Sequence, residues 1–211
     1  MGEGGGEGGE TAGTRCFPLT LTLSRRGRGK YRCSAKGFQA MPTFARPRVV
    51  VSRCLGFSAC RWNGAAISDA FVRRLADHVT FCAVCPEMEI ALVCPRDPIR
   101  VVLVDGERRL VQPATGRDVS DAMRAYASRT LEAMGDVDGF LLKSRSPSCG
   151  ISDVKLYADT ESDRPEGLGR GFFAEAVLAR FGHLPVEDER CLADPACRDR
   201  FLAGLLAAAR K

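Results

Sequence analysis

Residues 48–54 read RVVVSRC, and this short stretch decides the fold. Its three consecutive valines form a β-branched apolar run that suits a strand buried on both faces, as in a parallel sheet. Apolar runs over 79–84 and 139–142 indicate two more such strands. Each run ends at, or shortly before, a cysteine in the following turn or loop: Cys54, Cys85 and Cys149.

Helical patterns separate these strands. The clearest helix is expected over 120–134, where apolar side chains recur at steps of three and four; Ser120 is expected to cap its start and Gly135 to end it. A last helix is expected to open at Asp194-Pro195, an N-cap followed by proline. The remaining expected elements are helices over 65–77 and 172–181, a turn or short helix over 88–92 and a strand over 99–104.

The alternation of strands and helices predicts an α/β fold, a single domain with a mostly parallel sheet flanked by helices. In such sheets ligands collect outside the carboxyl ends of the strands. Cys54, Cys85 and Cys149 each follow such an end, so the three are expected to converge on one site. Spacing alone does not separate a shared metal or cluster site from three buried, small, hydrophobic side chains.

From length and composition, we expect this domain to cover residues 47–211. The chain has 211 residues, 45% of them hydrophobic, which is enough for one core of ordinary size. Residues 1–46 form a Gly/Arg-rich tail without helical or strand periodicity, and we expect it to be disordered. Because Met41 stands just before the first strand, it is a candidate for the natural start.

The charge distribution argues against binding to duplex nucleic acid. Residues 1–40 contain seven Lys/Arg and three Glu, which leaves 24 basic and 23 acidic residues in the body of the chain. Phosphate binding would need a basic excess on the folded part. Ten cysteines without a signal peptide indicate a reducing compartment, where thiols persist as ligands or buried side chains rather than disulfides. With no apolar stretch of roughly 18 residues to span a membrane, a cytoplasmic protein is expected.

Three motifs in order resemble those of the thiouracil desulfidase-like family: VVVSRCLGFSACRWNG, AVCPEMEIALVCPRDP and GFLLKSRSPSCGISDVKLY. The resemblance covers nearly all of the body, from about 47 to 210. Two positions depart from the family pattern. Asn63 stands where many relatives have Asp, and Ala91 stands where the family usually has Gly, which leaves the substrate open.

The resemblance implies a 4Fe-4S cluster held by Cys54, Cys85 and Cys149, with one iron left without a protein ligand. That iron would bind the sulfur of a thiolated nucleobase or similar small heterocycle, and water would replace the sulfur without net redox change. The implied enzyme is an iron-sulfur-dependent desulfidase with hydrolytic C=S cleavage. Glu87, two residues after Cys85, is the expected general base or acid, with Glu89 as a nearby alternative. The other candidate site residues are Ser146 in catalysis and Arg61, Trp62 and Ser148 in substrate binding.

Two alternatives remain beside this interpretation. The first is functional: the same cluster, or a zinc ion, would serve a sensor or interaction module without catalysis. The second concerns the C-x-x-C of Cys82 and Cys85, which could form half of a zinc site with Cys191 and Cys197. Packing is the simpler expectation for Cys60, Cys82, Cys94 and Cys191.

Overall fold

The computed structural model describes residues 46–210 of the chain. The predicted disorder of the N-terminal tail and the proposed start at Met41 therefore lie outside the described residues, Arg46 excepted. Within the described part, no helix is both long and apolar enough to cross a lipid bilayer.

The elements follow one another in a mixed α/β order. They are β1 (Arg48–Ser52), α1 (Ala70–Leu75), β2 (Thr80–Val84), α2 (Pro86–Glu89), β3 (Arg100–Val104), β4 (Glu107–Gln112), β5 (Arg117–Asp118), α3 (Ser120–Ala133), β6 (Gly139–Leu142), β7 (Val154–Tyr157), β8 (Gly167–Gly169), α4 (Phe172–Phe181), β9 (Val186–Asp188), the 3-10 helix η1 (Cys191–Ala193) and α5 (Pro195–Ala208).

The central sheet has four parallel strands in the order β2-β1-β6-β9. Strand β1 lies in its middle, with Val50 opposite Cys82 on one side and Phe140 on the other. The valine run of β1 is fully buried, as its composition predicts. The predicted α/β class and the parallel pairing of the three cysteine-bearing strands are confirmed.

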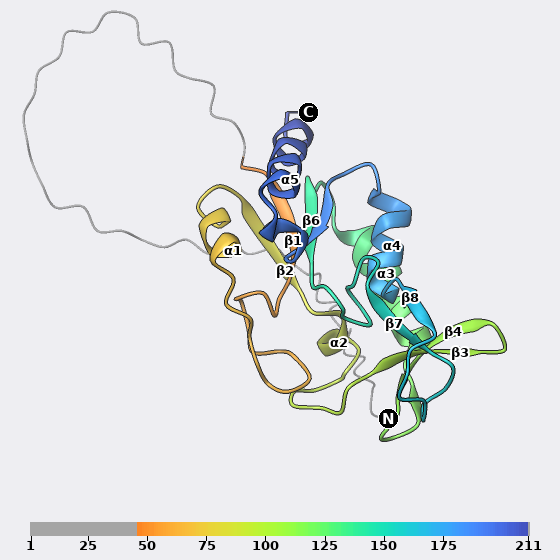
Figure 1. The fold of residues 1–211 in the computed structure, drawn as a ribbon. Coiled ribbons are helices and arrows are strands. Elements are labelled where there is room, and N and C mark those ends of the chain that lie inside the picture. Colours follow the sequence, from red (N-terminus) through yellow and green to blue (C-terminus); the bar gives the residue numbers. More distant parts are fainter. Residues whose placement is uncertain (1–45, 211) are drawn as a thin grey trace, which may run out of the picture.

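Alternate residues of β1 and β6 face opposite layers of helices. On one face, Val50 and Phe140 share an apolar cluster with Met123 of α3 and Phe173 of α4. On the other face, Val49, Val51 and Leu141 pack with Val72 and Leu75 of α1 and with Phe201 and Leu205 of α5. Each fully buried Phe side chain contributes about 1.5–3 kcal/mol relative to exposure. The parallel sheet is thus enclosed between two helical layers (Figure 1).

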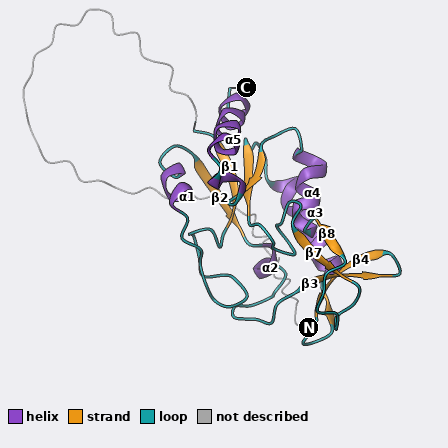
Figure 2. Cartoon of the chain, viewed as in Figure 1, coloured by secondary structure: helices purple, strands orange, loops and turns teal. Residues whose placement is uncertain are grey.

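A second sheet has five mixed strands in the order β5-β4-β3-β7-β8. Strand β3 pairs antiparallel with β4 and parallel with β7. In Figure 1 this sheet lies below and to the right of the parallel one, and Figure 2 shows the two groups of strands in orange. Of its members, the sequence predicted only the strand at 99–104.

The helices confirm most expectations and correct two. Helix α4 has the predicted bounds, α3 ends before Gly135 at φ 65°, and the Asp194 side chain accepts a hydrogen bond from Ala196 N at the start of α5. Helix α1 is shorter than the predicted 65–77. Ser120 does not cap α3, because its hydroxyl accepts a hydrogen bond from the amide of Leu110 in the adjoining strand.

Candidate functional site

Cys54, Cys85 and Cys149 line one cavity of about 850 Å³ at the carboxyl edge of the parallel sheet. All three are free thiols. The first two turns are joined directly, since the amide of Arg53 donates to the carbonyl of Val84 at 2.7 Å. The expected convergence of the three strand ends is therefore observed in the geometry, and a volume in this range suits a small molecule.

The loop that carries Cys149 is held from two sides. The Ser146 hydroxyl accepts hydrogen bonds from the amides of Ser148 and Cys149, at 3.2 and 3.1 Å. From the other side, the amides of Phe173 and Ala174 in the first turn of α4 donate to the carbonyl of Ser148, at 2.9 and 3.1 Å. This dense bracing fixes the backbone on either side of Cys149.

The thiols lie in surroundings that disfavour the thiolate in the absence of a partner. Burial, together with the neighbouring Cys85, raises the pKa of Cys54 to about 11, although Lys143 and Arg61 oppose the shift. Burial raises the pKa of Cys85 to about 12 and also raises that of Cys149. Metal coordination is the usual means by which a buried cysteine is deprotonated at neutral pH.

The three thiols offer the donor atoms of an iron-sulfur cluster. Cys54, Cys85 and Cys149 come from three separate loops and line one cavity. Within residues 46–210, one group of three potential ligand atoms lies within 4.8 Å of one another, and it does not include these cysteines. Three thiolates from separate loops are the donor type that iron-sulfur clusters require.

Two carboxylates line this cavity, Glu87 and Asp153. Asp153 accepts a hydrogen bond from the amide of Arg145 and pairs with Arg190, whereas Glu87 is held beside the Cys149 loop. Its Oε2 accepts a hydrogen bond from Arg96 Nη2 at 2.5 Å, and its Oε1 accepts hydrogen bonds from the hydroxyls of Ser146 and Ser148, at 3.4 and 3.1 Å. The alternative, Glu89, pairs instead with Arg53 at 2.9 Å and does not line the cavity. Geometry therefore favours Glu87 over Glu89 for chemistry in the cavity.

The predicted substrate-binding residues occupy different places. Arg61 and Trp62 line the cavity, and Trp62 is 45% exposed, so its ring is accessible to a ligand. Ser148 is completely buried and lies behind the cavity lining. Its hydroxyl contacts Glu87, so Ser148 is placed to orient that carboxylate rather than to touch a substrate.

The two departures from the family pattern have local structural explanations. The Asn63 side chain accepts a hydrogen bond from the amide of Ala65 at 3.2 Å, a turn contact that aspartate can also make. Ala91 has φ of 62°, a left-handed conformation in which glycine is favoured. Ala91 lies outside the cavity lining, so its effect falls on the turn after α2.

Three residues of the cavity wall have positions that sequence reasoning missed. Arg96 is 5% exposed and joins Glu87 to the carbonyl of Cys60, the latter at 3.2 Å. Lys143 pairs with Glu189 at 2.5 Å and lies close enough to Cys54 to lower its pKa. Cys60 faces the same cavity as the three expected cysteines. For Cys60, the available signal was its C-x5-C spacing from Cys54. The two ion pairs join residues 9 and 46 positions apart, and neither separation forms a recognisable sequence pattern.

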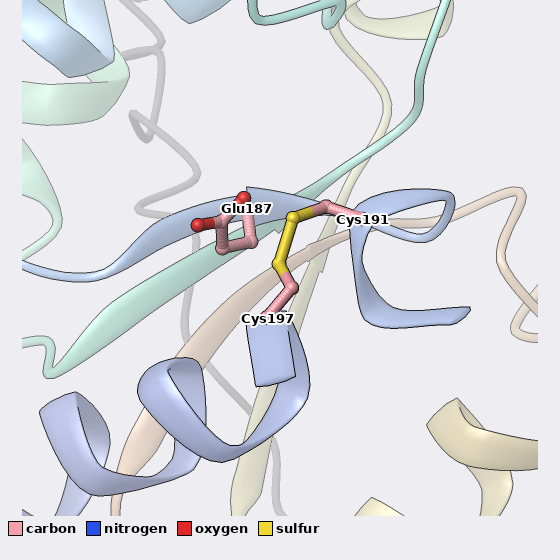
Figure 3. A group of neighbouring side chains, drawn as sticks. All are labelled: Glu187, Cys191 and Cys197. Carbon is pink, nitrogen blue, oxygen red and sulfur yellow. A yellow bond between two sulfur atoms is a disulfide. The ribbon is translucent and has the colours of Figure 1, made fainter. Parts of the chain in front are cut away.

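Cys191 and Cys197 form a disulfide, which corrects the expectation that Cys191 is a packing thiol. Helix η1 and the first turn of α5 bring their Cα atoms to 5.9 Å, a separation that a disulfide spans. Figure 3 shows Glu187 beside this bridge; these three residues form the close group of ligand atoms mentioned above. None of them lines the thiol cavity. Cys82 is also disulfide-bonded rather than a packing thiol, so Cys82, Cys191 and Cys197 cannot supply thiolates to a zinc site with Cys85.

The fold and cavity define an α/β domain with a thiol-lined site at the carboxyl edge of its parallel sheet. The family model described as 2-thiouracil desulfurase matches residues 49–189, and the chain belongs to this family. The resemblance noted from the three sequence motifs is thereby confirmed.

Two relatives place the chain further. It is 32% identical over 147 residues to the uncharacterized protein YbbK of Bacillus subtilis (strain 168), which covers 66% of this chain and 95% of YbbK. Among solved structures it resembles the 4Fe-4S-dependent thiouracil desulfidase TudS, with a TM-score of 0.54 and 28% identity. That match covers 73% of this chain and 98% of the TudS chain.

Proposed function

We propose that this domain hydrolyses the C=S bond of a thiolated nucleobase, or of a similar small thiocarbonyl heterocycle, without net redox change. The observation that carries the proposal is the meeting of three free thiols with the braced carboxylate of Glu87 in one cavity. Membership of the 2-thiouracil desulfurase family and the likeness to TudS support it.

Cys54, Cys85 and Cys149 would hold a 4Fe-4S cluster. The donor set fits, because the thiols are free, come from three separate loops and line one cavity. When bound through three protein thiolates, the cluster supplies an iron that accepts the substrate's sulfur and the negative charge that collects on it.

Glu87 is assigned the proton transfers. Water must lose a proton as its oxygen attacks the thiocarbonyl carbon, and a carboxylate has about four acceptor sites. Arg96, Ser146 and Ser148 occupy three of them, which leaves one for water. Glu87 then returns this proton to the departing sulfur, and the hydroxyl of the adduct gives up its remaining proton to the sulfur as the C=O bond forms. Both protons of water thus leave with the sulfur as hydrogen sulfide. No electron acceptor is needed.

The remaining side chains of the cavity would orient the heterocycle. We assign Ser146 a catalytic role, since its hydroxyl contacts Glu87 and its residue lines the cavity. The aromatic face of Trp62 and the guanidinium of Arg61 would hold a flat ring, while Ser148 positions Glu87 from behind.

The test is anaerobic purification of the full chain, with iron and sulfide content measured first and release of sulfide and uracil from 2-thiouracil measured next. Glu87→Gln should lower kcat by about 100-fold or more with unchanged iron content. Glu89→Gln is the matched control and should stay near wild type. Cys149→Ala should lose the iron. Bound cluster without sulfide release from any thiolated base would refute desulfidation.

One observation favours a second candidate, a cluster-binding sensor without catalysis. Cys60 is a fourth free thiol in the same cavity, and four cysteine ligands would leave no iron open. The three hydrogen-bond donors that position Glu87 argue against this candidate, because a sensor without catalysis does not need a positioned carboxylate. The substrate assay above separates the two functions.

A further inference from the structure

Cys60 is placed among the three expected cluster ligands rather than in the protein core. It is 3% exposed, it lines the thiol cavity, and its side chain shares a hydrogen bond with the thiol of Cys85. Both remain free thiols. Cys60 belongs to neither of the two apolar clusters that enclose the parallel sheet, so packing does not explain its burial.

The loop around Cys60 is fixed on both sides. Arg96 Nη1 donates to the carbonyl of Cys60 at 3.2 Å, and the amide of Arg96 donates to the carbonyl of Trp62 at 2.8 Å. The thiol of Cys94 donates to the carbonyls of Ala59 and Arg61, at 3.2 and 3.0 Å. These hydrogen bonds hold the residues on either side of Cys60 in place. A loop held in this way keeps the Cys60 thiol facing the other cysteines.

We infer that Cys60 is a displaceable fourth ligand of the cluster that Cys54, Cys85 and Cys149 hold, an inference that rests on the proposed function. Without substrate, the Cys60 thiol loses its proton to solvent and its thiolate binds the iron that the other three cysteines leave open. When a thiocarbonyl sulfur binds that iron, the Fe–S bond to Cys60 breaks and the thiolate takes up a proton. One sulfur ligand replaces another, so the oxidation state of the iron is unchanged.

The consequence is a protected resting state. An iron without a protein ligand is the one that a mild oxidant or chelator removes, and a fourth thiolate would retain it. The structure favours displacement of Cys60 because it lies in the connection between β1 and α1, eight residues after β1 ends. Cys54 and Cys85 lie within two residues of a strand end, and Cys149 sits in the braced loop between β6 and β7. Cys60 is thus the cysteine whose ligation can be given up with the least disturbance of the sheet.

The experiment uses the full chain reconstituted anaerobically with 57Fe, as wild type, Cys60→Ala and Ser58→Ala. Ser58 is the matched control, an exposed residue on the same loop that does not line the cavity. Mössbauer spectra should show four cysteine-ligated irons in wild type and Ser58→Ala, and one distinct iron in Cys60→Ala. Under ferricyanide, Cys60→Ala should lose that iron at least about tenfold faster than either.

A measurement on wild type alone guards against a variant that fails to assemble. The fraction of Cys60 alkylated by iodoacetamide is determined by mass spectrometry with and without 2-thiouracil. It should be low in the cluster-loaded protein and rise when 2-thiouracil is added. Equal alkylation in both states, or identical spectra and iron loss in Cys60→Ala and wild type, would overturn the inference.

The failure of the inference and that of the proposed function have different signatures. If wild type releases sulfide from 2-thiouracil while Cys60→Ala has an unchanged spectrum, the desulfidase stands and the role of Cys60 is wrong. If Cys60 stays bound and protected in 2-thiouracil and no sulfide appears, both displacement and desulfidation are refuted.

Discussion

Replacement of Gly171 by alanine should disturb the site through the backbone, although Gly171 contributes no side chain to the cavity. Gly171 is the N-cap of α4 and lies against the loop that carries Cys149. A Cβ atom there would lie 2.5 Å from the carbonyl carbon and oxygen of Ser148 and 2.8 Å from the amide nitrogen of Cys149. These are backbone atoms, so no side-chain rotation can relieve the overlap.

The size of the effect follows from these distances. Ordinary contact begins at 3.4 Å, so the loop and the helix must move apart by the difference from 2.5 Å, which is 0.9 Å. Overpacking of this kind costs about 1–3 kcal/mol, or a fall in melting temperature of roughly 3–10 °C. A displacement of about 1 Å at a reacting group costs on the order of 100-fold in rate. Gly171→Ala should therefore lower iron content and sulfide release more strongly than it lowers the free energy of unfolding.

The assay compares thermal unfolding, iron per chain and sulfide release from 2-thiouracil in wild type, Gly171→Ala and Gly167→Ala. Gly167 is the matched control, because a Cβ atom added there meets nothing within 4 Å. Gly167→Ala should resemble wild type in all three measurements. The reasoning is refuted if Gly171→Ala keeps the wild-type melting temperature and iron content, since the close approach would then carry no constraint.

Three further predictions concern single side chains. Ala91→Gly should raise the free energy of unfolding by about 0.5–1 kcal/mol, because it relieves a left-handed alanine; unchanged urea unfolding would contradict this. Burial acts to raise the pKa of Glu189, but hydrogen bonds from Lys143 and Ser144 outweigh it and lower that pKa. The stabilisation that ionised Glu189 contributes is therefore fully present at a pH above the ordinary glutamate pKa. It is lost as the pH falls through the lower pKa that Glu189 has in the folded protein. Glu189→Gln should cost about 1.5–3 kcal/mol at pH 7, and its gap from wild type in urea unfolding should narrow below about pH 4; a pH-independent gap would count against the ion pair. Trp62→Ala should raise KM for 2-thiouracil by roughly 2–10-fold with little change in kcat, and an unchanged KM would remove Trp62 from the binding site.

The parallel sheet was predictable because its strands are buried on both faces. The runs at β1, β2 and β6 consist of almost uninterrupted apolar residues, and each has its cysteine in the turn or loop that follows. Parallel pairing then forces the three carboxyl ends to one edge. The positions of Cys54, Cys85 and Cys149 follow from that topology without knowledge of any distance.

The second sheet was not predicted, although one of its turns was visible in the sequence. Asp105-Gly106 stands between β3 and β4 with φ of 52° and 80°, and Asp-Gly between two strands is a strong hairpin signal. It was overlooked because β4, with the sequence ERRLVQ, begins with three charged residues and lacks a clear apolar run. Strands β7 and β8 are short, and β7 joins the sheet by pairing with β3, which lies far from it in the sequence.

The raised pKa values of the cavity thiols limit the kinds of chemistry that these thiols can perform. A nucleophilic cysteine needs a lowered pKa from a helix N-terminus or a cationic neighbour, whereas burial raises the pKa of Cys54 to about 11 and that of Cys85 to about 12. Such thiols react poorly at neutral pH on their own, and a metal centre that displaces their protons gives them a role. The raised pKa values therefore favour ligation over covalent catalysis. They leave the proton chemistry to a carboxylate, and of the two that line the cavity, Glu87 is the one hydrogen-bonded to the Ser146 and Ser148 hydroxyls of the Cys149 loop.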